Sequence, residues 1–281
     1  MTTKQTSSIS CEFFPPRTEK GVIKLREVRK QLEVLQPAYF SVTFGAGGST
    51  QAKTFETVIE IQQASDFDAA PHLSCIGSTR ENVLKLLRDY QAHDIHRIVA
   101  LRGDKPSGWA GELGDFRYAN ELVSFIRAET GSHFHIEVGA YPEFHPEARS
   151  ANADLDYFKQ KVEAGANAAI TQYFYNADAY FRLIEDCAKR GVDIPIIPGI
   201  MPISNYEQLA RFSDTCGAEI PRWLRQRLKD FGDDKAALQD FGVDVMTNLC
   251  ERLLAGGAPG LHFYTLNQAE LTLKIAKRLG L

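Results

Sequence analysis

The sequence predicts an α/β fold of the (β/α)8 TIM-barrel class, in a single domain that spans residues 1–281 with extra helices between the seventh and eighth strands. Short apolar stretches and amphipathic helical stretches alternate eight times along the chain, which is typical of parallel strands joined by crossover helices. The 281 residues also match the roughly 250 that such a barrel needs. Neither a linker nor a change in composition indicates a second domain.

The first strand is predicted just before the two prolines at 15–16. Ile9, Cys11 and Phe13 alternate with polar residues, and this period of two is that of a strand with one buried face. Proline has no backbone N–H to donate to a neighbouring strand, so the strand ends before residue 15.

The other elements follow from the same periodicities, because an apolar run predicts a buried strand and apolar residues three or four apart predict a helix. Strands are expected at residues 39–44, 69–75, 97–101, 135–140, 168–175, 194–200 and 261–266. Helices are expected at residues 18–35, 50–64, 79–93, 118–130, 155–164, 179–190, 206–215 and 268–279. Amphipathic helices fill the insertion up to about residue 255, with residues 231–240 expected as a loop.

The composition excludes several classes of function. A net charge of −4 gives no electrostatic case for binding nucleic acid or an anionic membrane surface. The polar N-terminus does not resemble a signal peptide, and no stretch approaches the roughly 20 apolar residues of a membrane span. Five scattered cysteines argue against disulfides and for a reducing compartment. We therefore expect a cytoplasmic protein.

Glu12 lies near the end of the first predicted strand, where a buried carboxylate needs a partner. One interpretation is an ion pair with a nearby cation such as Arg17. The other is an acid whose pKa is raised by its apolar neighbours, so that it can donate a proton. On this stretch alone, both interpretations stay open.

Polar residues follow nearly every predicted strand, and in barrels of this class the active site lies at the carboxyl ends of the strands. Together they favour a small-molecule site over a set of solvated turns. Neither a P-loop nor a G-x-S-x-G motif is present. His133 and His135 lack further ligands at metal-binding spacing, so we expect them to pack in the core and expect no metal site. The residues at the strand ends are Glu12, Thr43, His72, Arg102, Gly103, Asp104, Tyr141, Glu143, His145, Gln172, Thr265 and Asn267.

Eight motifs follow one another along the chain: CEFFPPR (11–17), SVTFGAGG (41–48), HLSCIG (72–77), ALRGD (100–104), YPEFHPEA (141–148), AGANAAITQYFY (164–175), IIPGIMP (196–202) and HFYTLN (262–267). In this order they resemble the motifs of the bacterial type of methylenetetrahydrofolate reductase. The resemblance implies a flavoprotein that reduces 5,10-methylenetetrahydrofolate to 5-methyltetrahydrofolate and so supplies methionine synthesis. It also implies FAD as the cofactor, NADH or NADPH as the co-substrate, and a homodimer or homotetramer.

The resemblance also implies a role for individual residues. Glu12 matches the general acid that protonates N10 of the folate, and Asp104 matches an ionised carboxylate that stabilises the resulting iminium cation. Substrate contacts are implied for Asp104, Gln172, Gln208, Phe212 and Gln268. FAD contacts are implied for Thr43, Phe44, Ala46, His72, Arg102, Gly103, Asp104, Tyr118, Ala119, Tyr141, His145, Ala148, Asp154, Tyr157 and Lys161.

Two positions differ from the family pattern. Gln268 stands where a basic residue is expected, and Tyr157 stands where a small amide is expected near the adenosine. Two other classes of function stay open at this point, a pterin-binding methyl-transfer barrel without flavin and a flavin-binding protein without catalysis. A yellow protein would exclude the first class, and bleaching by NADH would exclude the second.

Overall fold

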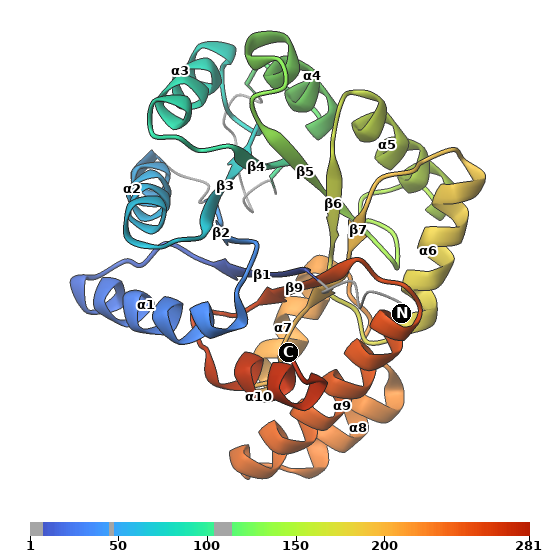
Figure 1. Ribbon diagram of the computed structural model, residues 1–281. Helices are drawn as coiled ribbons and strands as arrows, with labels where there is room; N and C mark the ends of the chain where they lie inside the picture. The colour runs from blue at the N-terminus through green and yellow to red at the C-terminus, as the bar shows by residue number, and fades with distance from the viewer. Residues whose placement is uncertain (1–7, 45–47, 104–113) are drawn as a thin grey trace, which may run out of the picture.

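The structure is a computed structural model that describes residues 8–44, 48–103 and 114–281. In these residues, nine parallel strands form one sheet in the order β7-β6-β5-β4-β3-β2-β1-β9-β8, and the helices form a ring around it (Figure 1). The strands are β1 (Ser8–Phe13), β2 (Tyr39–Val42), β3 (Asp68–Ser74), β4 (Arg97–Leu101), β5 (His135–Ala140), β6 (Ala168–Thr171), β7 (Ile196–Ile197), β8 (Gly199–Ile200) and β9 (Gly260–Tyr264). The predicted barrel class is therefore confirmed.

The helices begin at polar caps that the sequence supplies. Thr18, Thr79, Ser150 and Asn205 each accept a hydrogen bond from a backbone N–H of the first helical turn. The helices are α1 (Glu19–Leu32) with a following 3-10 turn η1 (Glu33–Leu35), α2 (Gly48–Ala64), α3 (Arg80–Ala92), α4 (Ala119–Thr130), α5 (Ala151–Glu163), α6 (Ala177–Lys189), α7 (Tyr206–Cys216), α8 (Arg222–Asp230), α9 (Lys235–Ala255) and α10 (Glu270–Leu279).

The expectation of a loop over residues 231–240 is wrong in its second half, because α9 begins at Lys235. Asp234 caps this helix by accepting a hydrogen bond from the Ala237 N–H at 3.0 Å. Two alanines follow in the first turn and favour the helix. The run of aspartates that looks like a surface loop is thus the start signal of the longest helix described.

The predicted seventh strand is split into the two short strands β7 and β8. Pro198 lies between them and has no backbone N–H to continue the ladder. The segment still closes the barrel, because the Ala169 N–H of β6 donates to the Pro195 carbonyl oxygen at 2.9 Å and the His262 N–H of β9 donates to the Pro198 carbonyl oxygen at 3.0 Å. Gly199 is needed here, since a Cβ atom would lie 2.2 Å from the Thr171 carbonyl oxygen.

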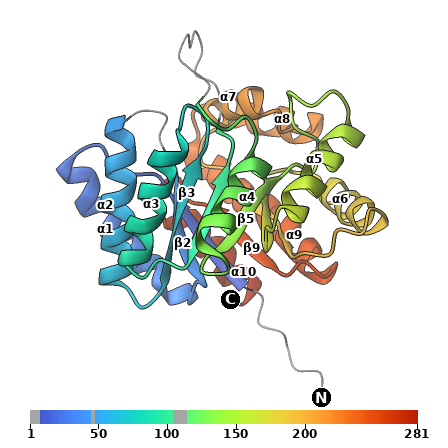
Figure 2. The same cartoon turned by 90° about the horizontal axis from the view of Figure 1, so that it is seen from above.

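The two ends of the barrel are covered by different parts of the chain. Helices α7 and α8 lie toward one end and the chain terminus after α10 lies toward the other (Figure 2). Because only five residues separate the end of β8 from α7, the α7 end of the barrel is the end at which the strands finish. This is the end where active sites form in such barrels.

Candidate active site

Glu12 lies near the carboxyl end of β1 and faces two histidines. The His72 Nε2 atom of β3 is 3.2 Å from Glu12 Oε2, and the His262 Nε2 atom of β9 is 3.6 Å from the same oxygen. The Glu12 side chain is 16% exposed, whereas both histidines are buried. The fold therefore assembles a carboxylate and two imidazoles from three strands that are far apart in sequence.

The environment of Glu12 corrects both interpretations drawn from the sequence. Burial raises the pKa of its carboxyl group, but the charges and hydrogen bonds of His72 and His262 outweigh burial and lower the pKa to about 2. The expected rise of the pKa is therefore wrong. Arg17 is not the partner either, because it lines a groove between α1 and α2. Glu12 is an ionised carboxylate held beside two imidazoles.

A cleft of about 590 Å³ opens at the carboxyl ends of β4 and β5, against the first turns of α4 and α5. It is lined by nine of the residues for which the family resemblance implies FAD contacts, and these lie on α4, on α5 and in the segments that follow β4 and β5. These nine are Arg102, Tyr118, Ala119, Tyr141, His145, Ala148, Asp154, Tyr157 and Lys161.

The other residues with implied FAD contacts lie elsewhere. Thr43 and Phe44 directly follow β2, and His72 faces Glu12 instead of lining the cleft. Gly103 lies two residues after the end of β4 and has a left-handed φ of 86°, which favours glycine. Ala46 and Asp104 lie outside the described residues.

The cleft carries more positive than negative side chains. Its wall holds four cations, against the two carboxylates of Glu147 and Asp154. Arg102 Nη1 lies 2.6 Å from Glu147 Oε2. Burial lowers the pKa of Lys161 to about 8, and Asp154 only partly offsets this effect. An anionic ligand would stabilise the Lys161 charge. The four cations are Arg102, Arg117, Arg149 and Lys161.

Two aromatic rings add a flat apolar surface to the same cleft. The rings of Tyr118 and Tyr157 are inclined by only 12°, with 6.4 Å between their centroids. Both side chains are largely exposed, at 55% and 45%. Exposed, nearly parallel tyrosine rings suit the stacking of a planar base.

The residues with implied substrate contacts lie around the barrel end. Gln172 directly follows β6, and its Oε1 atom accepts from the Tyr173 N–H at 3.0 Å. Gln208 and Phe212 lie one turn apart on α7, where Phe212 is 39% exposed. Gln268 is exposed in the turn after β9. Asp104, implied for substrate as well as for FAD, is outside the described residues.

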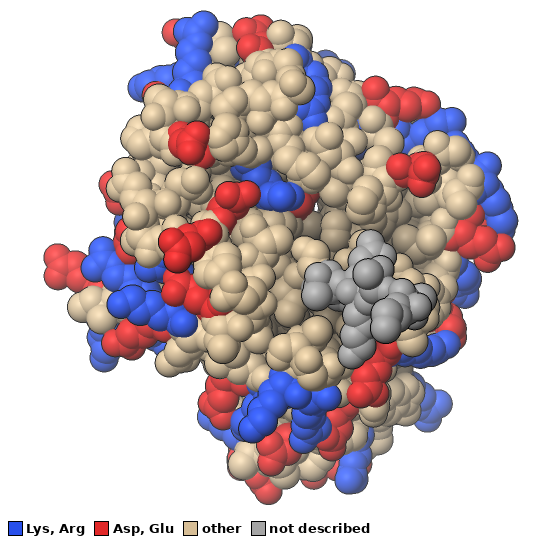
Figure 3. All heavy atoms as spheres, viewed as in Figure 1, with Lys and Arg blue, Asp and Glu red and all other residues tan. Residues whose placement is uncertain are grey.

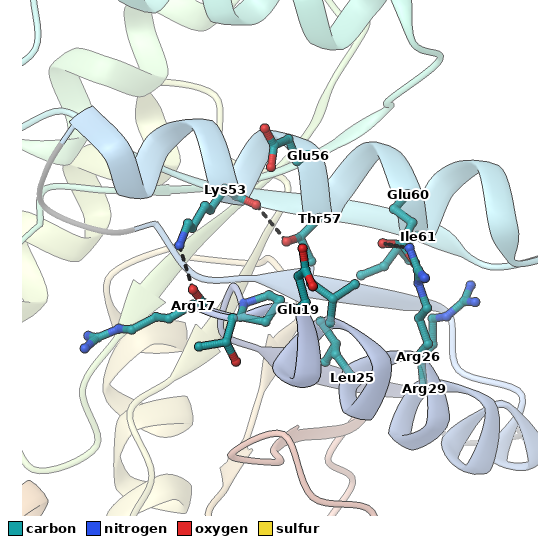
Figure 4. A pocket seen from close by; sticks show the side chains of 13 residues that line it. Arg17, Glu19, Leu25, Arg26, Arg29, Lys53, Glu56, Thr57, Glu60 and Ile61 are labelled. Atoms are coloured by element: carbon teal, nitrogen blue, oxygen red, sulfur yellow. Dashed lines mark hydrogen bonds and ion pairs between the residues drawn. The ribbon is translucent and has the colours of Figure 1, made fainter.

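A second groove, of about 400 Å³, runs between α1 and α2 on the outside of the barrel (Figure 4). Three of its charged side chains already bind one another or the backbone: Arg26 Nε lies 2.6 Å from Glu60 Oε1, and Lys53 Nζ donates to the Arg17 carbonyl oxygen at 3.0 Å. In Figure 3, charged side chains of both signs lie mainly around the rim of the barrel face. The groove holds four cations and three carboxylates, so its charge is closer to balance than that of the cleft at β4 and β5, which holds four cations and two carboxylates.

His133 and His135, expected to pack in the core, are only partly buried. His135 is 41% exposed and lies 3.8 Å from Glu137 Oε1, while His133 Nε2 is 3.0 Å from the Ile95 carbonyl oxygen. Among the described residues, no group of three or more His, Cys, Asp or Glu side chains is arranged to hold a metal ion.

Sequence reasoning missed His262 and the polar residues behind it. The signal was present, because a histidine stands inside the apolar run LHFY and a glutamate stands inside HIEVGA. A charged or polar residue in the middle of a buried strand needs a buried partner. His262 and Glu137 both occupy such positions, at 0% and 1% exposure.

Known proteins share the sequence and the fold. A family model described as "Methylenetetrahydrofolate reductase" matches residues 1–280. The chain is 40% identical over 273 residues to the 5,10-methylenetetrahydrofolate reductase of Escherichia coli (strain K12), across 97% of this chain and 90% of that protein. It is 36% identical over 293 residues to "Methylenetetrahydrofolate reductase (NADH) 1" of Arabidopsis thaliana, across 100% of this chain and 50% of that protein. A solved Clostridium thermocellum protein, described as binding two copies of 5-methyl-5,6,7,8-tetrahydrofolic acid, has a TM-score of 0.68 at 17% identity, over 99% of this chain and 97% of that one. That likeness shows the fold alone.

Proposed function

Because the chain belongs to the methylenetetrahydrofolate reductase family, we propose that it holds FAD in the cleft at β4 and β5 and uses NADH to reduce folate beside Glu12. The reaction of the family is the conversion of 5,10-methylenetetrahydrofolate to 5-methyltetrahydrofolate. The observation that carries the proposal is the Glu12 carboxylate at the carboxyl end of β1, with two imidazoles within 3.6 Å.

The cleft fits FAD by the chemistry of its side chains. Lys161 and Arg102 offer charge-assisted hydrogen bonds to a diphosphate, and the excess of cations favours an anion. Tyr118 and Tyr157 offer a stacking surface to the adenine. When bound, FAD supplies the hydride transfer between the nicotinamide and the folate.

Glu12 supplies the proton. The five-membered ring of the substrate must open to a 5-iminium cation before it can accept a hydride, and opening requires a proton on N10. Glu12 is ionised in the ligand-free protein, so it must first receive a proton from a neighbour, and His72 and His262 are the nearest donors. The carboxylate that remains after transfer stabilises the iminium cation.

The substrate is held by residues around the same barrel end. Gln172 offers an amide from the end of β6, and Phe212 offers an exposed ring from α7. Gln208 lies on α7 one turn before Phe212, and Gln268 lies in the turn after β9. The role of Asp104 beside the iminium cation rests on the family resemblance.

The experiment that tests this function is Glu12→Gln, with the two half-reactions measured separately under anaerobic conditions. The amide cannot donate a proton to N10, so flavin reoxidation by methylenetetrahydrofolate should slow on the order of 10²-fold or more, while flavin reduction by NADH is retained. Glu60→Gln, in the groove between α1 and α2, removes a carboxylate elsewhere and serves as the control. Equal loss of both half-reactions in Glu12→Gln would show a structural role for Glu12 instead.

We place residues 1–281 in one catalytic domain of a cytoplasmic homodimer or homotetramer. The five cysteines, all free, support a reducing compartment. In the described part of the chain, no helix is long and apolar enough to cross a membrane. Light scattering of the purified protein tests the oligomeric state.

A further inference from the structure

The turn after β9 hydrogen-bonds the end of β1 through two side chains, and the two strands lie side by side (Figure 1). The Thr265 hydroxyl donates to the Glu12 carbonyl oxygen at 2.6 Å. The Asn267 side chain binds both backbone groups of Phe14, because its Nδ2 atom donates to the carbonyl oxygen at 2.9 Å and its Oδ1 atom accepts from the N–H at 3.0 Å. Side chains of one turn therefore hold three backbone groups of residues 12–14.

These side chains continue the pairing of β1 beyond its last partner in β9. The register of the two strands ends where Glu12 lies opposite Tyr264. The prolines at 15–16 have no backbone N–H with which to extend the ladder. The Phe14 side chain is 45% exposed, so its packing contributes little to holding the chain here. The hydrogen bonds to Asn267 take over where strand pairing stops.

The turn itself is strained. Leu266 and Asn267 have left-handed φ angles of 51° and 55°. This region is unfavourable for leucine, whereas asparagine tolerates it. The Asn267 N–H donates to Thr265 Oγ1 at 3.2 Å, and the Gln268 N–H donates to the Thr265 carbonyl oxygen at 3.0 Å. Such strain persists where surrounding contacts determine the conformation, and it clusters at functional sites.

The position of the Glu12 carboxylate depends on the backbone that this turn holds. Glu12 is the last residue but one of β1, and the ends of elements fray when their backbone groups lose their partners. On the opposite side, the Thr43 N–H donates to the Phe13 carbonyl oxygen at 2.9 Å, so residues 12–14 are held from both neighbouring strands. A general acid must lie within hydrogen-bond reach of its target, and a misplacement of about 1 Å can cost about 10²-fold in rate.

We propose that Thr265 and Asn267 are positioning residues that hold Glu12 where it can protonate the folate. They take no part in the proton transfer and act through the backbone of residues 12–14. Gln268 directly follows Asn267 and is exposed, so the turn that holds the acid also carries a proposed substrate contact. The inference rests on the proposed role of Glu12 as the proton donor.

Two changes remove the contacts without straining the turn. Asn267→Gly removes both hydrogen bonds to Phe14, and glycine favours the left-handed φ at this position. Thr265→Val removes the hydroxyl that donates to the Glu12 carbonyl oxygen, whereas Thr265→Ser keeps a hydroxyl there. The serine variant therefore tests whether the hydrogen bond, rather than the shape of the side chain, is needed.

The two half-reactions of each FAD-loaded, full-length variant are measured separately under anaerobic conditions. Flavin reoxidation by methylenetetrahydrofolate should slow roughly 10- to 100-fold in Asn267→Gly and in Thr265→Val. Flavin reduction by NADH should stay within about twofold of the wild-type rate, because it needs no proton from Glu12. Thr265→Ser should keep the wild-type rate of both half-reactions.

Asn176→Gly is the matched control, because Asn176 also binds the backbone through its side chain. Its Oδ1 atom accepts from the Asp178 N–H at 3.0 Å at the start of α6, and glycine is tolerated at such a cap. This variant should leave both half-reactions unchanged. Slowing of reoxidation by the same factor as in Asn267→Gly would show a general effect of lost hydrogen bonds and would overturn the proposal.

A double-mutant cycle decides whether the two residues act through Glu12. If they do, Asn267→Gly and Thr265→Val should slow reoxidation no further in the Glu12→Gln background, because the acid that they position is already absent. The proposal is overturned if the two changes cost the same factor with and without Glu12, or if they slow both half-reactions equally.

Failure of the positioning role and failure of the proposed function give different results. If only the positioning role is wrong, Glu12→Gln alone still loses folate reduction, while Asn267→Gly and Thr265→Val either retain it or add their cost to that of Glu12→Gln. If the proposed function is wrong, Glu12→Gln alone retains folate reduction, and the positioning role falls with it.

Discussion

The Lys161 ammonium of α5 donates a hydrogen bond to the Gly139 carbonyl oxygen of β5. The charged end of this helix residue therefore lies in the wall of the cleft, near the carboxyl end of β5. Its charge is only partly compensated there, and burial lowers its pKa from 10.5 to about 8. The unfolded chain thus binds this proton more tightly than the folded chain. The free energy of unfolding of the ligand-free protein should therefore rise between about pH 8 and pH 10.5.

Lys161→Met should remove this pH dependence and stabilise the ligand-free protein at pH 7 by about 1–3 kcal/mol. The same change should weaken FAD binding about tenfold or more, because a charge-assisted contact is lost. Denaturant unfolding and flavin titration measure the two effects. Tighter FAD binding by the methionine variant would contradict a diphosphate at this position.

Tyr157→Ala should weaken FAD binding by roughly 5- to 150-fold, because stacking of a base on an aromatic ring contributes about 1–3 kcal/mol. The remaining ring of Tyr118 then contacts the adenine on one side only. Trp223→Ala, which removes a 58% exposed ring on α8, is the control. If both alanine variants bound FAD equally well, the adenine would lie away from Tyr157.

Gly103→Ala should destabilise the protein by about 1–3 kcal/mol and release flavin, because the new Cβ atom would lie 1.9 Å from Ser74 Oγ in a left-handed backbone conformation. Ser74 donates to the Arg102 carbonyl oxygen at 2.9 Å, so its displacement also moves Arg102. Gly191→Ala is the control, because Gly191 also has a positive φ but a Cβ atom added there would have no atom within 4 Å. Its destabilisation therefore measures backbone strain without a clash. Thermal unfolding with and without FAD gives the comparison.

Gln268→Arg should lower the Michaelis constant for folate a few-fold at low salt and less at high salt, since a new cation would meet an acidic part of the substrate near solvent. The nearby Lys274 does not already serve, because its Nζ atom lies 3.0 Å from Glu270 on the same helix. Kinetics at two ionic strengths, with folate and with NADH, test this. A change only in the constant for NADH would assign the loop to the nucleotide.

Much of the fold follows from local sequence signals, because alternating apolar runs and helical spacing need no knowledge of distant partners. The errors have local causes too. Apolar residues continue past Thr171, but β6 ends there, at the last residue that pairs with β5, while β7 pairs only with Ala169 and Ile170. The split at Pro198 depends on which neighbours pair with each half of the strand.

The site is harder to predict, because its electrostatics come from residues far apart in the chain. Glu12 stands out in sequence through its position at a strand end. The sign of its pKa shift depends on His72, which is 60 residues away, and on His262, which is 250 residues away. Apolar neighbours alone would raise the pKa, and only the closed barrel brings in the two imidazoles that lower it.

Because of the break at Pro198, β7 and β8 are the most weakly paired part of the barrel wall. Each has only two paired residues, so their amides should exchange with solvent sooner than those of β1 or β4. Helix α7, with Gln208 and Phe212, is separated from β8 by only five residues. Local opening of β7 and β8 would move these two side chains away from the barrel end, while β1, which carries Glu12, would stay paired with β2. Under the proposed function, the part of the barrel that opens would carry substrate contacts and the part that stays paired would carry the proton donor, so exchange of one ligand for another need not disturb Glu12.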